Sequence, residues 1–233
     1  HLMRPALRRF GRRTDYAAAV SIVITAGNLT GSITLTGMDD SLDENDETVV
    51  IDINSVVNAN ENGIQQVTAT ITDDDPLPTV QFTAASQSGA EGGGPLTVTV
   101  QLSVVSGRDV TVPFSLAGTA TGGGTDYSIS ASPLIIAAGS TTGTITLTLN
   151  NDSLDEDDET AVVTMGTPIN ATALGTTVHT ATITDDDPLP TVTLSLAGSP
   201  LAENGGVATV TATLSVVSGR AGVQCYLRSS RVI

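Results

Sequence analysis

A dense group of carboxylates is the chemistry that this sequence offers most clearly. The ten residues 151–160 (NDSLDEDDET) contain six acidic side chains and no basic one. At about 4 Å and an effective dielectric constant near 20, each pair of such charges repels by roughly 4 kcal/mol. A folded protein therefore keeps this loop either splayed into water or wrapped around cations. Carboxylate oxygens on a flexible loop favour calcium, which accepts about six to eight oxygen ligands.

Other acidic residues lie where a β-sandwich would bring them to the same loop. Glu91 precedes a glycine run, Asp126 follows another, and an acidic triplet occupies 185–187. A strand rises about 3.3 Å per residue, so a strand over 79–85 carries the chain toward the end at which Glu91 lies. The last strand of the repeat returns to that end and delivers the triplet. We therefore expect the four acidic places to meet at one tip of the domain.

Calcium is the preferred interpretation among several. Zinc would need Cys or His ligands, and magnesium, which keeps more water, is the second choice. Without metal, the loop would be a solvated turn, the triplet a charged linker and Asp126 a cap for its glycine-rich turn. Asp152 and Glu156 have the residue types of a glycosidase acid and base, but only 3% of the residues are aromatic and available as sugar platforms. We expect a binding module and not an enzyme, with a metal-independent adhesive or spacer repeat as the alternative.

Internal repetition organises the elements that carry these acids. ITDDDPLPTV at 71–80 recurs 112 residues later at 183–192, and SVVSGR at 103–108 recurs at 215–220. The acidic loop has a relative, DDSLDENDET, at 39–48. The repeat predicts five parts, which are a foreign or disordered flank at 1–13, the C-terminal part of a truncated repeat at 14–75, a complete repeat at 76–187, the start of a third repeat at 188–220 and a second foreign or disordered flank at 221–233.

The complete repeat has the pattern of short strands separated by turns. Apolar and polar residues alternate over 79–85 and 95–103, which is the period of a half-buried strand. With no helix-length pattern between them, this spacing favours an all-β sandwich. His179 is expected to pack on the apolar face of the last strand, and Arg108 to be a surface turn residue. The five further predicted strands are 109–116, 133–137, 143–149, 160–165 and 177–184.

The distribution of charge narrows the class of partner. The net charge is −16, and all 25 acidic residues lie between Thr14 and Gly219 with a single basic residue, Arg108. Such a field excludes nucleic acid as a natural partner and favours cations. A salt-adapted surface would scatter its acids, whereas these are clustered. The sequence contains no apolar run of about 18 residues, so it predicts no membrane span. Its basic start lacks the apolar core of a signal peptide.

Several motifs together resemble one family. GTATGGGTDY at 118–127, LIIAAGSTTGTITLTLNNDSLDEDDET at 134–160 and HTATITDDD at 179–187 are similar to the Calx-beta domain. This module occurs in sodium–calcium exchangers and in repeat-bearing bacterial surface proteins. The resemblance spans about 14–220 and is complete over 76–187. It implies immunoglobulin-like antiparallel β-sandwiches in tandem, with calcium ions at one tip, in a secreted or cell-surface protein.

The resemblance also implies calcium ligands, position by position. In the complete repeat they are Glu91, Asp126, Asp152, Glu156, Glu159, Asp185, Asp186 and Asp187. In the first repeat they are Asp15, Asp39, Asp40, Glu44, Glu47, Asp73, Asp74 and Asp75. Asn151 stands where the family usually has the first Asp of a pair, which weakens one ion position. The first repeat lacks a counterpart of Glu91, and the third has only Glu203.

Two hypotheses concern the assembly of repeats. Because 185–187 runs directly into the next repeat, bound calcium would stiffen the joint between repeats of a larger protein. The first repeat lacks opening strands, and the third supplies such strands at 192–197 and 207–214. An unpaired sheet edge invites strand addition. Head-to-tail self-association by strand complementation is therefore the second hypothesis.

Overall fold

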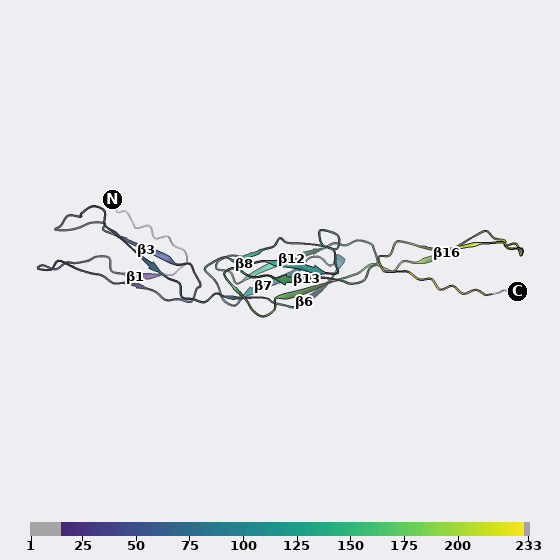
Figure 1. Ribbon diagram of the computed structural model, residues 1–233, viewed down its shortest axis with the longest axis horizontal. Helices are drawn as coiled ribbons and strands as arrows, with labels where there is room; N and C mark the ends of the chain where they lie inside the picture. The colour runs from purple at the N-terminus through teal and green to yellow at the C-terminus, as the bar shows by residue number, and fades with distance from the viewer. Residues whose placement is uncertain (1–14, 231–233) are drawn as a thin grey trace.

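The computed structural model describes residues 15–230, in which the regular elements are β-strands and one short 3-10 turn. Figure 1 shows three groups of strands in a line: two antiparallel pairs, a sandwich and a final hairpin. The predicted flank at 1–13 and the last three residues of the flank at 221–233 lie outside the described residues. Among the described residues, no helix is long and apolar enough to cross a membrane.

The larger sheet of the sandwich has five strands in the order β10-β12-β7-β5-β14. Neighbours pair antiparallel, except that β14 pairs parallel with β5. The alternating Thr and apolar residues of β7 and β12 place one face of each strand in the core. The strands are β5 (Thr79–Phe82), β7 (Leu96–Leu102), β10 (Tyr127–Ile129), β12 (Thr142–Leu149) and β14 (Thr172–Ala173).

The smaller sheet has four strands in the order β6-β15-β13-β9. β15 pairs antiparallel with β13 and parallel with β6. A two-stranded sheet, β8 (Val110–Val112) with β11 (Leu134–Ile136), adds Val110, Val112 and Ile136 to the core of the sandwich. The strands of the smaller sheet are β6 (Ser86–Ala90), β9 (Phe114–Gly118), β13 (Glu159–Met165) and β15 (Val178–Thr184).

The core lies between the two sheets of the complete repeat. Val100 of β7 and Ile145 of β12 are 0% exposed, as are Val163 of β13 and Ala181 of β15. Every second residue of a strand points to the same face, so this burial pattern confirms the predicted all-β, immunoglobulin-like sandwich. His179 also faces the core, where its ring meets that of Phe82 edge-on at 6.3 Å.

The structure corrects several predicted strands. The segment 79–85 is not one strand, because β5 ends at Phe82 in the larger sheet and the chain crosses to the smaller sheet as β6. Pro113 has no N–H to donate, and it divides the predicted strand 109–116 into β8 and β9. Two further short strands, β10 and β14, have no alternation that predicts them.

The flanking groups contain fewer strands than the sandwich. β1 (Tyr16–Ala18) pairs with β2 (Leu35–Gly37), and β3 (Glu47–Asp52) pairs with β4 (Gln66–Ile71). β16 (Val192–Ala197) and β17 (Thr209–Leu214) form the final hairpin. The domain boundaries predicted after residues 75 and 187 fall between β4 and β5 and between β15 and β16. They remain predictions about how the chain divides.

Candidate metal centre

Strand register sends the acidic segments of the complete repeat to one end of the sandwich. Glu159, at the start of β13, pairs with Ile183 near the end of β15, and Ala90, at the end of β6, pairs with Thr184. The end of β12 pairs with the start of β10 through Leu149 and Tyr127. The four connections that carry the predicted ligands therefore emerge on the same side. We call this end, formed by residues 91–94, 119–126, 150–159 and 185–187, the acidic tip.

Three carboxylates form the first group at the acidic tip. One oxygen each of Glu91, Asp186 and Asp187 lies within 4.8 Å of the others. Glu91 opens the 3-10 turn Glu91–Gly93 and is 7% exposed. Gly92 leaves room for this packing, because a Cβ there would lie 2.8 Å from Asn151 Oδ1 and 3.0 Å from Asp186 Oδ2. The glycine run after Glu91 thus lets the loops approach closely.

A second group of three comes from the loop before β10, the loop after β12 and the start of β13. Oxygens of Asp126, Glu156 and Glu159 also fall within 4.8 Å of one another. Asp126 accepts a hydrogen bond from Thr121 N, and its own N–H donates to Thr121 O at 3.0 Å. Asp126 therefore closes its glycine-rich loop and also turns toward the acidic tip, so the cap and ligand interpretations are compatible.

Burial, and after it mutual repulsion, raises the pKa values of the acidic tip. Burial raises the pKa of Glu91 to about 7, and the charges of Asp152 and Glu156 add to the shift. Burial and a hydrogen bond with Asp126 raise the pKa of Glu159 to about 7. Burial followed by neighbouring carboxylates also raises the pKa values of Glu156 and Asp187. Raised values mean that the folded chain resists full ionisation of this tip.

The residues present fit a hard divalent cation. The two groups offer only carboxylate oxygens, which calcium prefers. The Oδ2 atom of Asp187 is buried and has no hydrogen-bond partner among the described residues, so a positive ligand there would satisfy it. His179 is not part of either group, since its Nδ1 lies 2.7 Å from Ala84 O in the core.

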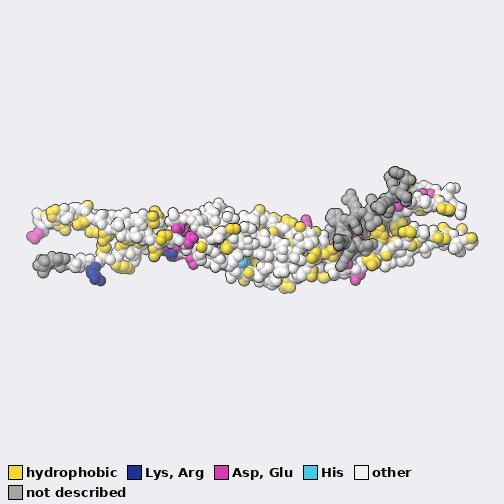
Figure 2. All heavy atoms as spheres, turned by 180° about the vertical axis from the view of Figure 1, so that it is seen from behind, with side chains coloured by type: hydrophobic (Ala, Val, Ile, Leu, Met, Phe, Trp, Pro, Cys, Tyr) yellow, Lys and Arg dark blue, Asp and Glu magenta, His cyan; other side chains and the backbone are white. Residues whose placement is uncertain are grey.

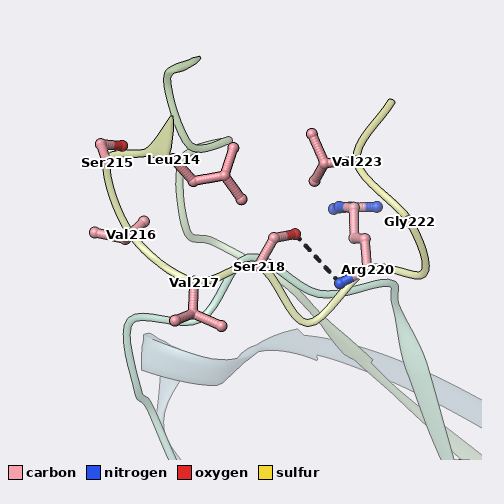
Figure 3. Close-up of a pocket in the computed structure, with 8 residues that line it drawn as sticks. All are labelled: Leu214, Ser215, Val216, Val217, Ser218, Arg220, Gly222 and Val223. Atoms are coloured by element: carbon pink, nitrogen blue, oxygen red, sulfur yellow. Dashed lines mark hydrogen bonds between the residues drawn. The ribbon is translucent and has the colours of Figure 1, made fainter. Parts of the chain in front are cut away.

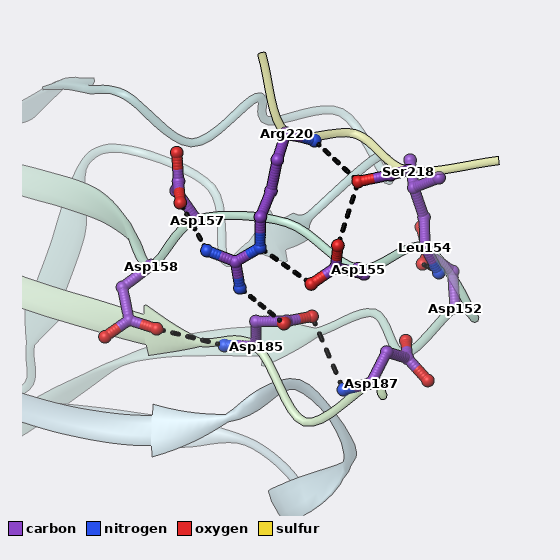
Figure 4. A network of polar contacts seen from close by, with 9 residues as sticks. All are labelled: Asp152, Leu154, Asp155, Asp157, Asp158, Asp185, Asp187, Ser218 and Arg220. Carbon is purple, nitrogen blue, oxygen red and sulfur yellow. Dashed lines mark hydrogen bonds and ion pairs between the residues drawn. The ribbon is translucent and has the colours of Figure 1, made fainter. Parts of the chain in front are cut away.

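The two remaining predicted ligands of the complete repeat make other contacts. Asp152 Oδ1 accepts from Leu154 N at 2.7 Å, while the charge of Asp152 acts on Glu91 and Glu156. Asp185 contacts Arg220 at 3.2 Å and accepts from Asp187 N at 3.4 Å. Asp185 therefore lies between Asp187 and Arg220, a basic side chain of the third repeat (Figure 4).

The predicted ligands of the first repeat also converge, but less tightly. Burial is the largest cause that raises the pKa of Glu44. The nearby charges raise this pKa further, and they belong to Asp40, Glu47, Asp15 and Asp73. Burial also raises the pKa of Asp75. The charges of four neighbours raise this pKa further, namely Asp73, Asp74, Asp40 and Asp39. No group of three carboxylate oxygens within 4.8 Å is found in the described part of this repeat. Its lack of a counterpart to Glu91 is consistent with that difference.

Two acidic residues with a clear role escape the sequence prediction. Asp155 and its counterpart Asp43 are only 1% and 2% exposed, and each binds an arginine of the following repeat. Arg108 does lie in a turn, as predicted, but its side chain is only 23% exposed and it pairs with Asp43. Figure 2 shows acidic side chains and an arginine gathered where the sandwich meets the last hairpin. A useful signal was available, since SGR and LDE recur with the same period.

An open pocket also lies at this joint (Figure 3). Residues 214–223 line most of it, and Arg220 is the ionisable side chain on its wall. Val216 and Val217 are 51% and 75% exposed, so the wall is partly apolar. Among the described residues that line this pocket there is no carboxylate, so its composition offers no acid and base for hydrolysis.

Solved structures similar to part of this chain include domains named CBD. CBD12 from CALX1.2 is 22% identical, with a TM-score of 0.43, over 47% of this chain and 44% of that chain. The apo form of the Calx CBD1 domain is 18% identical, with a TM-score of 0.41, over 48% of this chain and 100% of that chain. The calcium binding domain CBD12 of CALX1.1 is 19% identical, with a TM-score of 0.43, over 50% of this chain and 49% of that chain. This chain thus spans less than half the length of the first and third of them.

A family comparison covers the first two repeats. The family model described as the Calx-beta domain matches residues 12–75 and 73–187, which together are most of the chain. Both matches contain an acidic loop of the kind found at the acidic tip. The protein therefore belongs to the Calx-beta domain family.

Proposed function

We propose that this protein is a non-catalytic calcium-binding repeat module. The observation that carries the proposal is the convergence of two groups of three carboxylates on one tip. Membership of the Calx-beta family supports the same assignment. One of the similar structures is described as a calcium binding domain, and we propose the same ligand for this chain.

The chain's own residues would hold the ion from four loops. Bound calcium supplies positive charge that offsets the repulsion among the tip carboxylates. Glu91, Asp186 and Asp187 would form one half of the site, and Asp126, Glu156 and Glu159 the other. Asp152 lies close enough to both halves to act on Glu91 and Glu156. The first repeat, with its looser cluster, would bind more weakly.

We further propose that calcium stiffens the joint between repeats of a larger secreted or bacterial surface protein. Asp185, Asp186 and Asp187 follow β15 directly and precede β16 of the next repeat. A cation held by Asp186 and Asp187 would restrict the segment 185–190 and protect it from proteolysis. The position of the acidic tip at the exit of the sandwich favours this role over that of a passive spacer.

Isothermal titration of the whole chain tests the proposal. Calcium should bind with saturable heat, and magnesium more weakly, because magnesium gives up its water reluctantly. Glu91→Gln should weaken binding about tenfold or more, since one lost charge interaction of about 1.4 kcal/mol changes affinity tenfold. The matched control is Glu203→Gln, which removes the same charge from an exposed position of the third repeat.

The outcomes of that titration are distinct. Unchanged calcium affinity in Glu203→Gln, with a loss in Glu91→Gln, supports the assigned site. No heat with calcium in the unaltered chain contradicts the proposed function. It would favour the alternative of a metal-independent adhesive or spacer repeat.

A second candidate property is self-association, favoured by exposed faces on the final hairpin. Leu194 and Val210 are 57% and 53% exposed, whereas their counterparts Phe82 and Val98 in the complete repeat are both 1% exposed. β7 pairs with residues 142–147 of β12 in that repeat. The matching segment of the first repeat is 30–35, so β17 of one copy would add to that segment of another.

Light scattering at increasing concentration tests this association. The expected result is a molar mass that rises to a dimer or beyond, because edge pairing is concentration-dependent. Val210→Asp should restore the monomer, since a charge on the paired face opposes packing. A monomeric mass at every concentration would contradict strand complementation.

A further inference from the structure

We propose that the Ser–Gly–Arg turn of each repeat is a docking element for the acidic loop of the repeat before it. The partner that fits the loop is thus the turn of a following repeat, with arginine as its third residue. This inference goes beyond calcium binding, because it assigns a second site to the acidic loop. We call the contact of residues 218–220 with Asp155, and its counterpart of 106–108 with Asp43, the Ser–Gly–Arg clasp.

The guanidinium of Arg220 contacts three carboxylates of the complete repeat (Figure 4). Arg220 Nε donates to Asp155 Oδ1 at 2.7 Å, and Nη2 lies 3.2 Å from Asp185 Oδ2. Nη1 donates to Asp157. The fork of an arginine suits several planar carboxylates at once, which a lysine cannot reproduce. The site therefore selects arginine by geometry as well as by charge.

Ser218 and the backbone complete the contact. The hydroxyl of Ser218 donates to Asp155 Oδ2 at 2.8 Å, and Gly219 N donates to Asp155 O at 2.9 Å. Both carboxylate oxygens and the carbonyl of Asp155 are thereby engaged by the third repeat. Asp155 is 1% exposed, so these partners compensate a carboxylate that has lost its water. The arginine beside Asp155 also lowers the pKa of that carboxyl group.

The joint between the first and the complete repeat shows the same contact independently. Ser106 Oγ donates to Asp43 Oδ2 at 2.8 Å, and Gly107 N donates to Asp43 O at 2.8 Å. Arg108 Nε donates to Asp43 Oδ2 at 3.2 Å. Two different pairs of repeats thus meet through the same kinds of contact, which is the expected property of a docking element and not of one accidental ion pair.

The central glycine ties the Ser–Gly–Arg clasp to the acidic tip. A Cβ at Gly219 would lie 2.7 Å from Glu156 Oε1 and 2.8 Å from its Cγ. A Cβ at Gly107 would likewise lie 2.7 Å from Glu44 Cγ. The turn therefore packs directly on Glu156, a residue of the second carboxylate group, and a Cβ at Gly219 would force that side chain to move.

The acidic loop is consequently divided between two kinds of positive partner. Asp155, Asp157 and Asp185 contact the arginine of the next repeat. The two groups of three carboxylates do not include these residues. Docking through the Ser–Gly–Arg clasp therefore needs no bound calcium, although the glycine places it against the calcium site proposed above.

Distance measurements between two spin labels test the Ser–Gly–Arg clasp in the full chain. The labels are placed on cysteines introduced at Ser128 in β10 and Thr211 in β17, both exposed, after Cys225→Ser removes the native thiol. In EDTA the distance distribution should be narrow. Arg220→Gln should broaden it about twofold, since loss of the contact frees a hinge between packed units. Arg228→Gln, which removes an exposed arginine of the tail, is the matched control and should leave it unchanged.

Two further variants separate docking from general loss of structure. Arg220→Lys should broaden the distribution to an intermediate width, because it keeps the charge and loses the fork. Gly219→Ala keeps every charge and should broaden the distribution through contact with Glu156. A distribution in EDTA that is equally narrow in the parent and in Arg220→Gln would overturn the inference.

The same variants distinguish this inference from the proposed calcium function. Arg220→Gln should bind calcium as tightly as the parent or more tightly, because a competing positive group has been removed. If calcium fails to bind while Arg220→Gln still broadens the distance distribution, the calcium proposal fails and the Ser–Gly–Arg clasp stands. If calcium binds and the width of the distance distribution does not change in Arg220→Gln, the calcium proposal stands and the Ser–Gly–Arg clasp fails.

Discussion

Calcium should raise the melting temperature of the complete repeat by roughly 10 °C or more when it is supplied at about 100 times its dissociation constant. A ligand at that concentration stabilises the folded state by about 2.7 kcal/mol per site. For a domain of this size, each 1 kcal/mol shifts the melting temperature by about 4–8 °C. The acidic tip binds the ion only when its loops are assembled, so the unfolded chain competes poorly for calcium.

The physical origin of this stabilisation is the repulsion that folding imposes on the tip. Glu91, Asp186 and Asp187 meet within 4.8 Å, as do Asp126, Glu156 and Glu159. In the unfolded chain these groups separate into water, whose high dielectric constant weakens their repulsion. Calcium therefore acts on a destabilisation that exists only in the folded state.

Calorimetric melts in EDTA and in calcium measure the effect. Glu91→Gln should melt higher than the parent in EDTA, because one repelling charge is gone, and it should respond less to calcium. Sodium chloride should raise the EDTA melt less than calcium does, since monovalent ions screen charges at this short range less effectively than a bound divalent ion neutralises them. Identical melts of the parent in EDTA and calcium would contradict the proposed function.

The long strands of the fold are predictable because their side chains alternate. β7, β12, β13 and β15 each bury one face, and Thr or another polar residue occupies most positions of the other. β6 has the sequence SQSGA, which carries no such pattern. It becomes a strand because β15 offers it a parallel edge. Tertiary pairing of this kind overrides local propensity and is not visible in a short segment.

The acidic tip was predictable for a different reason. Its residues come from four connections, and the alternation of strand directions alone sends those connections to one end. The contacts of Asp155 depend instead on how one repeat meets the next. The spacing of residues within a repeat does not determine how two neighbouring repeats are oriented. Only the repetition of Ser218, Gly219 and Arg220 at residues 106–108 pointed to a shared role.

Without calcium, stability should fall as the pH rises from about 5 to 8. The pKa of Glu91 is raised from 4.5 to about 7 in the folded protein, so between these values the folded state holds a proton that the unfolded chain has released. Stability of this origin is fully present below the unfolded pKa and is lost as the pH passes the folded one. A pKa difference of 1 corresponds to about 1.4 kcal/mol of free energy, so Glu91 alone accounts for a loss on the order of 3 kcal/mol.

Other groups of the tip change the slope but not its sign. Burial and Asp126 raise the pKa of Glu159 to about 7, so Glu159 acts in the same direction as Glu91. Arg220 lowers the pKa of Asp155, and the stability that this contact contributes is lost only as the pH falls through the lowered value. Asp155 therefore contributes a constant amount above about pH 5. The window from about pH 5 to 8 isolates the acidic tip.

With saturating calcium, the slope should vanish or reverse, because the ion binds the ionised carboxylates and competes with protons. The difference between the calcium and EDTA melting temperatures should then grow from about pH 5 to pH 8. Chemical unfolding at fixed pH values measures both slopes, and Glu91→Gln should flatten the slope in EDTA. A stability in EDTA that rises over this pH range would show that these carboxylates ionise in the folded protein without a free-energy cost. The convergence of carboxylates would then lack the energetic consequence on which calcium binding depends.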